Sequence, residues 1–125
     1  MTRTETGRAG EAAVCAYLEK EGYRIAARNY RIKGGEIDII AENGFYLAFV
    51  EVKTRSKDSL ESGFNAVNSR KKKLIIKTAV DYCCKNPGTL QPRFDIAEVI
   101  MENGSVSSID YIKNAYDTTG CKFIF

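Results

Sequence analysis

Hydrophobic and polar residues follow two different periods along this chain. In residues 4–20, apolar positions recur at spacings of three and four, which predicts a helix that ends near Gly22. The same spacing recurs from Ser69 to about Lys85, with Asn68 or Ser69 as its cap and Asn86-Pro87-Gly88 as its stop. Shorter apolar or alternating runs predict strands over residues 23–32, 36–41, 46–55, 93–101 and 106–112.

The predicted element order is α-β-β-β-α-β-β. Asn43-Gly44 and Asn103-Gly104 are strong signals for tight turns between antiparallel strands. The strand at 93–101 follows a helix, and it should therefore lie parallel to the strand at 46–55 after a right-handed crossover. A break in the alternation near Arg28-Asn29 indicates a bulge. The sequence thus predicts an α/β fold with a mixed central sheet of about five strands flanked by helices, in a single domain over residues 1–125.

Two segments lack a period and are predicted as loops. Residues 56–62 are polar and form a candidate flexible lid. Residues 114–125 are predicted as a loop before a short apolar end. Their aromatic side chains either cover the edge of the chain's own sheet or dock on a partner subunit; they are Tyr116, Phe123 and Phe125.

The hairpin over residues 36–55 carries charges inside apolar strands. With Asn43-Gly44 as a two-residue turn, Asp38 pairs with Phe49, and Glu36 pairs with Glu51. Paired residues share a face and side chains alternate along a strand, so one face receives Glu36, Asp38, Glu51 and Lys53. A three-residue loop or a bulge would send Asp38 to the opposite face.

This grouping of carboxylates costs free energy unless something compensates it. A hard divalent cation with oxygen ligands would do so, because buried carboxylates must be paired, protonated or bound to a metal. Lys53 would then lie beside the ion as an electrophile or as a group that orients water. The alternative is that these charges form the solvated face of an ordinary amphipathic hairpin.

Glu11 is a further candidate, because it shares the apolar face of the first helix with Val14 and Leu18. Gly7 and Gly10 would permit close approach of this helix to another element. The alternative is that Glu11 reaches solvent from the edge of the apolar stripe.

Composition narrows the class of protein. Hydrophobic residues make up 44% of the chain, with seven Tyr and six Phe, so a packed core is expected. The absence of histidine excludes histidine-based triads and bases, and four cysteines without a CxxC motif argue against zinc. No apolar run could cross a membrane, and the N-terminus has no secretion signal. We therefore expect a cytoplasmic protein with reduced thiols and no membrane partner, in which Cys15 packs in the core.

The net charge of +3 says little about binding partners, but the positions of the basic residues are informative. Basic residues gather at positions that suit contact with phosphates without reading sequence. These predicted nucleic-acid-binding residues are Arg8, Arg55, Lys57, Arg70, Lys71, Lys72 and Lys73. For the run from Arg70 to Lys73, the alternative is a solvated start of a helix.

Several motifs together resemble the YraN family of small bacterial proteins. The resemblance covers most of the chain, and its most specific part is Glu-Ile-Asp-Ile-Ile-Ala followed by Phe-Val-Glu-Val-Lys-Thr-Arg. The motifs are Gly10-Glu11-Ala12-Ala13, Gly22-Tyr23, Arg28-Asn29-Tyr30-Arg31, Gly35–Ala41, Phe49–Arg55, Ala66-Val67, Arg70-Lys71 and Phe94-Asp95. That family is similar to the restriction-endonuclease-like superfamily, with its PD-(D/E)xK signature, and to archaeal Holliday junction resolvases.

The resemblance implies roles for the candidate residues. Asp38 matches the first metal-binding aspartate of the superfamily. Glu51 and Lys53 match the (D/E)xK pair, and Glu11 matches a carboxylate on the first helix of resolvase-like members. The Val52 carbonyl would be an added metal ligand. The proline of the signature is absent here, since isoleucine precedes Asp38.

The function expected from these residues and this resemblance is metal-dependent hydrolysis of phosphodiester bonds in structured or branched DNA. Hard oxygen ligands favour Mg²⁺, with Mn²⁺ as the alternative. The competing hypothesis is a non-catalytic nucleic-acid-binding or adaptor protein that keeps the nuclease fold. A homodimer would suit a junction by symmetry. The sequence does not decide between DNA and RNA, and Glu36 has no assigned role.

Overall fold

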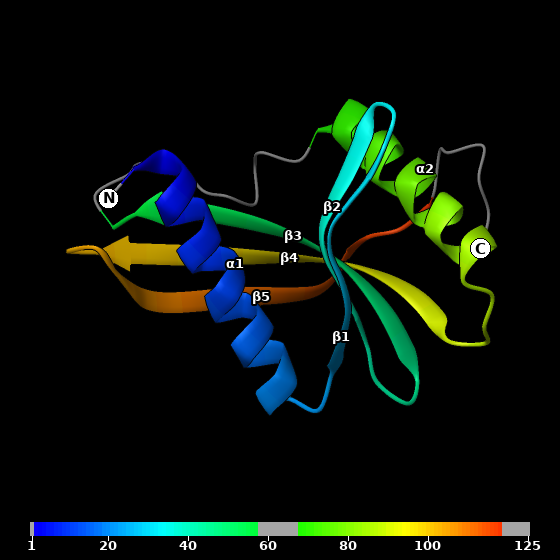
Figure 1. The fold of residues 1–125 in the computed structure, drawn as a ribbon, viewed down its shortest axis with the longest axis horizontal. Coiled ribbons are helices and arrows are strands. Elements are labelled where there is room, and N and C mark those ends of the chain that lie inside the picture. The colour runs from blue at the N-terminus through cyan, green and yellow to red at the C-terminus, as the bar shows by residue number, and fades with distance from the viewer. Residues whose placement is uncertain (1, 58–67, 119–125) are drawn as a thin grey trace.

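The computed structural model describes residues 2–57 and 68–118, and these residues form the predicted order of elements (Figure 1). The elements are α1 (Arg3–Lys20), β1 (Arg24–Ile32), β2 (Gly35–Glu42), β3 (Tyr46–Ser56), α2 (Ser69–Lys85), β4 (Gln91–Glu102) and β5 (Ser105–Tyr116). Thr2 caps α1 through a capping box with Glu5, and the Asn68 side chain accepts a hydrogen bond from the Lys71 N–H at the start of α2. No helix in residues 2–57 and 68–118 is long and apolar enough to span a membrane.

The five strands form one sheet in the order β1-β2-β3-β4-β5. Neighbouring strands are antiparallel except β3 and β4, which run parallel over Tyr46–Ser56 and Gln91–Met101. Helix α2 connects these two strands, as a crossover requires. The mixed sheet flanked by two helices confirms the predicted α/β class and is consistent with a restriction-endonuclease-like core.

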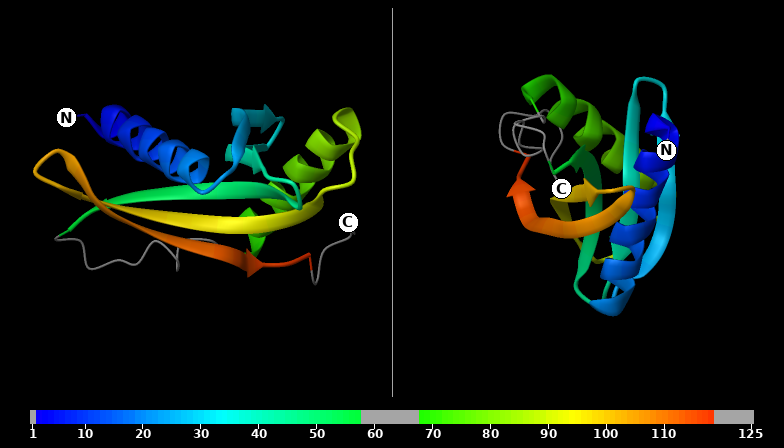
Figure 2. Two further views of the ribbon diagram at one scale, coloured as in Figure 1. Left: turned by 90° about the horizontal axis from the view of Figure 1, so that it is seen from below. Right: turned by 90° about the vertical axis from the view of Figure 1, so that its left-hand side faces the viewer.

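The two helices cover opposite faces of the sheet (Figure 2). Val14, Cys15 and Leu18 of α1 are buried with Ile39 and Val50, which confirms that Cys15 is a core residue. On the other face, the α2 cluster contains Ile75, Ile76 and Ala79 with Ile40, Phe49 and Phe94. Full burial of one large aliphatic or aromatic side chain contributes about 1.5–3 kcal/mol, so these two clusters hold the helices against the sheet.

The hairpin between β2 and β3 has a different register from the predicted one. Ile39 pairs with Val50, whereas a two-residue turn at Asn43-Gly44 would have paired it with Ala48. The reason is that the turn lies one residue later than expected, around Gly44-Phe45. The Asn43 N–H donates to the Tyr46 carbonyl at 3.1 Å, and the Asn43 side chain accepts hydrogen bonds from the N–H groups of Phe45 and Tyr46 at 2.8 and 2.7 Å. Since the shift is by two positions, Asp38 and Glu51 still face the same side, as predicted.

Two further expectations about strands are corrected. The register shift in β1 lies between Ile25 and Ala27 rather than near Arg28-Asn29, although Asn29 has a left-handed φ of 52°. Residues 114–116 belong to β5 and not to a loop, because the Tyr116 ring stacks on Phe94 with 5.4 Å between ring centroids. The candidate lid beyond residue 57 and the predicted tail residues Cys121, Phe123 and Phe125 lie outside the described residues.

Helix α1 approaches β3 closely at Gly10. A Cβ atom built on Gly10 would collide with the Thr54 hydroxyl, whereas one built on Gly7 would meet nothing within 4 Å. The prediction of close approach is therefore confirmed for Gly10 and wrong for Gly7.

We expect Gly10→Ala to lower the free energy of unfolding by about 1–3 kcal/mol, because helix and strand must move apart. Urea denaturation monitored by circular dichroism would measure it. The matched control is Gly7→Ala on the same helix, which should be neutral or stabilising by up to about 1 kcal/mol. Thr54→Ala should restore part of the loss, and equal effects of the two alanine substitutions would contradict the close contact.

Candidate functional site

The candidate site lies where β2 and β3 separate. Their ladder ends at the pair Ile39–Val50, and beyond it β2 remains paired with β1 while β3 remains paired with β4 (Figure 1). The start of β2 lies against α2. At Gly35 the two elements are so close that a Cβ atom would collide with the Thr78 hydroxyl. This divergence of the strands opens space inside the sheet for polar side chains.

Asp38 and Glu51 are the first residues of their strands beyond the last pair. The Val52 N–H, no longer used by the ladder, donates a 2.8 Å hydrogen bond to Oδ2 of Asp38. Both carboxylates line a cavity of about 260 Å³ between the β1–β2 turn and α2. The cavity is completed by Gly34, Gly35, Glu36, Lys71, Leu74 and Ile75. The structure thus brings together the two carboxylates that the hairpin pattern placed on one face.

Glu51 is buried and carries two ammonium partners. Its Oε1 atom lies 3.2 Å from Nζ of Lys53 and 2.5 Å from Nζ of Lys71. Lys53 reaches it from two positions along β3, and Lys71 reaches it from the first turn of α2. The two residues that match the (D/E)xK pair are therefore in contact, and Lys71 is a second lysine on the same carboxylate.

Charges in this site shift the pKa values of its members. Burial, followed by the negative charge of Glu51, raises the pKa of Asp38 to about 7, although the hydrogen bond from Val52 opposes this shift. Burial and the adjacent Lys71 lower the pKa of Lys53. Burial opposes protonation of Lys71, but contact with Glu51 outweighs it and raises the Lys71 pKa. Groups with perturbed pKa values in a cleft are typical of functional sites.

Glu11 lies on the other side of β3. It lines a separate cavity of about 380 Å³ with residues of α1 and the α1-facing side chains of β3, among them Thr6, Gly7, Val52 and Thr54. Its charge still contributes to the raised pKa of Asp38. Among the described residues, no three acidic, cysteine or histidine side chains are grouped closely enough to hold one metal ion. The arrangement therefore offers a centre of two carboxylates, with Glu11 outside it.

Glu36 does not face Glu51 as the expected register required. It pairs across the β1–β2 hairpin with Arg31, whose Nε lies 3.3 Å from its Oε1, and it is exposed at the rim of the cavity.

The predicted phosphate-binding residues differ in what their side chains contact. Lys71 lies in the site, and Nζ of Lys72 lies 5.3 Å from the centre of the Tyr116 ring. Arg55 bonds to the buried Glu98 at 2.5 Å, and Lys57 lies 3.4 Å from Glu102. The residues that are exposed along their helices are Arg8, Arg70 and Lys73. The basic run at the start of α2 is therefore neither wholly a surface patch nor wholly part of the site.

Sequence reasoning missed the central position of Lys71. The signal was present, because Lys71, Leu74, Ile75 and Thr78 follow the helical spacing of the apolar face of α2. Glu98 was also missed, although it interrupts an otherwise apolar strand. Tyr116 was assigned to the tail, yet its buried hydroxyl has no hydrogen-bond partner among the described residues. Burial, and then the charge of Glu51, raises the pKa of this hydroxyl.

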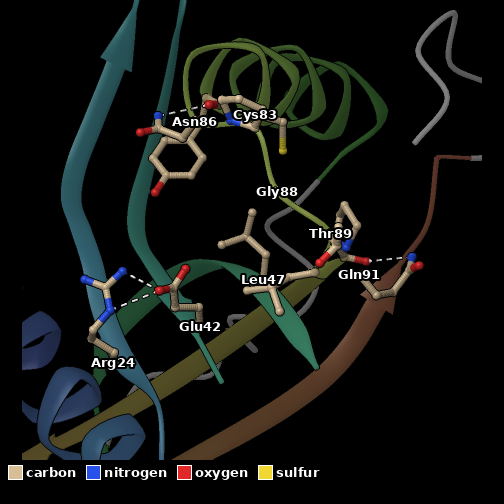
Figure 3. A pocket seen from close by; sticks show the side chains of 12 residues that line it. Arg24, Glu42, Leu47, Cys83, Asn86, Gly88, Thr89 and Gln91 are labelled. Atoms are coloured by element: carbon tan, nitrogen blue, oxygen red, sulfur yellow. Dashed lines mark hydrogen bonds and ion pairs between the residues drawn. The ribbon is translucent and has the colours of Figure 1, made fainter. Parts of the chain in front are cut away.

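A larger cavity of about 670 Å³ lies at the opposite end of α2 (Figure 3). Its charged residues neutralise each other, since Arg24 and Glu42 form an ion pair. The Asn86 amide donates to the Tyr82 carbonyl at 3.0 Å. No predicted site residue lines this cavity.

Comparison with known proteins gives a consistent result. Residues 10–99 match the model of a family described as "Uncharacterised protein family UPF0102". A UPF0102 protein of Alkaliphilus metalliredigens is 46% identical over 112 residues, which cover 88% of this chain and 96% of that protein. UPF0102 proteins of Clostridium acetobutylicum and Trichlorobacter lovleyi are 43% and 42% identical, over 90% and 89% of this chain and 93% and 89% of their own lengths.

Proposed function

The chain belongs to the UPF0102 family, also called YraN, and we propose that it is a metal-dependent nuclease that hydrolyses phosphodiester bonds in DNA. One observation carries this proposal: two carboxylates with a lysine in contact converge in a cavity at the point where two strands separate. This set of groups suits phosphoryl transfer, which needs positioning and neutralisation of charge more than covalent chemistry.

The donor set fits a magnesium ion. Mg²⁺ keeps several water molecules and is usually held by one or two carboxylates plus phosphate oxygens of the substrate, so a third protein carboxylate is not required. Asp38 and Glu51 would hold it, and the Val52 carbonyl is a further candidate. The raised Asp38 pKa supports this choice, because a cation would offset both the burial of the charge and its repulsion by Glu51, which are the two largest causes of the shift. When bound, the ion would polarise a phosphoryl oxygen and lower the pKa of a coordinated water.

The residues of the chain have separate tasks in this proposal. Lys53, held against Glu51, orients the attacking water or offsets the charge that grows on the phosphate. Glu11 acts from the far side of β3, through its charge or through a water. Exposed Arg70 and Lys73 on α2 provide phosphate contacts beside the cavity. The proposal includes branched DNA as the preferred substrate. This part of the proposal rests on the resemblance to Holliday junction resolvases.

A non-catalytic nucleic-acid-binding or adaptor protein is the second candidate. It is favoured by the position of Glu11, which lies in a cavity separate from Asp38 and Glu51. The first candidate is stronger because an adaptor has no need for two carboxylates and two lysines packed together, an arrangement that is costly without a ligand.

The proposal is tested by incubating the protein with linear duplex, single-stranded, flap and four-way-junction DNA, in Mg²⁺, Mn²⁺ or EDTA. We expect cleavage in the presence of metal only, and a loss of about 100-fold in Lys53→Ala, the scale seen when one group that stabilises a transition state is removed. Lys77→Ala, which removes an exposed lysine of α2, is the matched control and should retain activity. Binding of DNA without cleavage of any substrate in either metal would favour the adaptor.

A further inference from the structure

Lys71 occupies the position that a divalent cation would be expected to take beside Glu51. Its Nζ is 2.5 Å from Oε1 of Glu51, whereas Lys53 is 3.2 Å from the same atom. Lys71 comes from α2 and not from the strand that carries the (D/E)xK pair. The exposed fraction of its side chain is 36%. The ammonium is therefore able to leave this contact for solvent without unfolding the helix.

The charges of the site balance only while Lys71 is there. Ionised Asp38 and Glu51 together carry two negative charges, and Lys53 and Lys71 carry two positive ones. A divalent cation added to this set would leave two excess positive charges in a partly buried cavity, which is unfavourable at low dielectric. A phosphate group brings negative charge and oxygen acceptors to the same place, so it would restore the balance.

Resting on the function proposed above, we propose that Lys71 is the internal counterion of Glu51 and that a divalent cation and a nucleic-acid phosphate displace it together. Glu51 would then be free to hold the cation, and the released Lys71 ammonium would donate hydrogen bonds to the phosphate. Metal ion and nucleic acid then bind cooperatively, and by linkage each raises the affinity for the other by the same factor. The metal-free protein keeps Lys71 on Glu51 and binds metal more weakly without nucleic acid than with it.

The neighbouring lysines show why this role belongs to Lys71. Lys72 lies over the Tyr116 ring on another side of the helix, and Lys73 is exposed. Lys73→Gln removes one positive charge from the same helical turn without touching Glu51, so it is the matched control for Lys71→Gln. Lys71→Arg keeps the charge at the site and should behave as the wild type does.

The first experiment measures Mg²⁺ binding without DNA by isothermal titration calorimetry. We expect Lys71→Gln to bind Mg²⁺ at least about 5-fold more tightly than wild type, because it removes a charge-assisted contact that competes for Glu51. Lys73→Gln and Lys71→Arg should change the dissociation constant by less than about twofold. An unchanged constant in Lys71→Gln, in a protein whose metal binding depends on Asp38, would overturn the role of Lys71 alone. Absence of Asp38-dependent binding in the wild type would instead overturn the metal site.

The second experiment measures binding of a short DNA duplex by fluorescence anisotropy, with EDTA or with Ca²⁺, a larger cation that also prefers oxygen ligands. In the wild type, Ca²⁺ should strengthen DNA binding, and in Lys71→Gln this strengthening should be at least about 5-fold smaller. In Lys73→Gln, DNA binding should weaken equally in both conditions. Equal strengthening by Ca²⁺ in all variants would contradict displacement of Lys71. Thermal unfolding of each variant shows that it is folded during these measurements.

Discussion

Replacement of Asp38 by asparagine should make the metal-free protein more stable at neutral pH and should abolish its metal-dependent cleavage. The carboxylate lies in a partly buried cavity beside Glu51, and its pKa is raised to about 7 by burial and by that neighbouring charge. Asparagine keeps an oxygen that accepts the hydrogen bond from the Val52 N–H, but it carries no charge. The gain should be at most about 4 kcal/mol above pH 7, since the pKa rises from 3.8 to about 7 and one pKa unit corresponds to about 1.4 kcal/mol.

The raised pKa of Asp38 determines how this effect on stability depends on pH. An aspartate in the unfolded chain titrates near pH 3.8, so between that pH and about 7 the folded protein keeps a proton that the unfolded chain has released. Its free energy of unfolding therefore falls as pH rises through this window. The advantage of Asp38→Asn should be largest above pH 7 and should shrink as the pH approaches 4. Urea denaturation in EDTA at several pH values measures it.

Glu36→Gln is the matched control for this substitution. Glu36 lies on the same strand but is exposed and paired with Arg31, so its loss should change stability by less than about 1 kcal/mol at every pH. A stability difference between wild type and Asp38→Asn that does not vary with pH would contradict the buried, charge-coupled state of Asp38.

Divalent metal should reverse the order of stability. Binding to the folded state alone stabilises the wild type in proportion to the logarithm of metal concentration, and the asparagine variant should gain much less. Cleavage should fall by more than about 100-fold, since even residues that only support metal ligands contribute 10–100-fold. If the variant gained as much as the wild type from Mg²⁺, Asp38 would not be a ligand.

Asp38 also shows what the sequence could predict. The face of its side chain follows from alternation along the strand, and that prediction survived because the actual register shift is by two positions. The register itself depended on Asn43, whose side chain accepts two backbone hydrogen bonds and whose N–H bonds to Tyr46, so that the turn lies one residue later. A dipeptide pattern does not encode that choice. Faces of strands were therefore predictable where exact pairs were not.

Contacts between elements that are distant in the sequence were the other feature that could not be predicted. The helical period could place Lys71 on the apolar face of α2, but it could not show that this face lies against Glu51. Likewise Glu11 was correctly placed on the apolar face of α1, which packs on the side of β3 opposite the Asp38 cavity. Such relations follow from which face of the sheet each helix covers, and alternation within one strand does not determine that.

Replacement of Asp95 by asparagine should have the opposite effect on stability and lower the free energy of unfolding by about 3–5 kcal/mol. Asp95 is fully buried, and its carboxylate accepts hydrogen bonds from Nε and Nη2 of Arg93 at 2.9 and 2.8 Å. It also accepts from the Tyr111 hydroxyl at 2.6 Å and the Asn114 N–H at 2.9 Å. Burial and the charge of Asp95 raise the pKa of Tyr111, so this hydroxyl stays protonated and donates.

The cost of Asp95→Asn arises mainly from the partner that it leaves behind. Arg93 is itself buried, donates to the Tyr23 hydroxyl at 2.7 Å and lies 4.7 Å from the centre of the Tyr46 ring. Without Asp95, its charge has no carboxylate beside it, whereas replacing both members by apolar residues of similar size should restore much of the loss. Urea denaturation of Asp95→Asn and of Arg93→Met with Asp95→Leu measures this, with exposed Asp110→Asn as control.

A loss below about 1 kcal/mol in Asp95→Asn would mean that the hydrogen bonds of Asp95 contribute no more than a surface pair. The expected difference in sign between Asp95 and Asp38 separates their roles. Asp95 is surrounded by donors and a cation, so its charge holds β4 to the end of β5. Asp38 has one backbone donor and a second carboxylate beside it, so its charge destabilises the metal-free fold. A carboxylate kept at a cost to stability is expected where a ligand supplies the missing charge, and this reasoning supports the proposed role of Asp38 and indicates a structural role for Asp95.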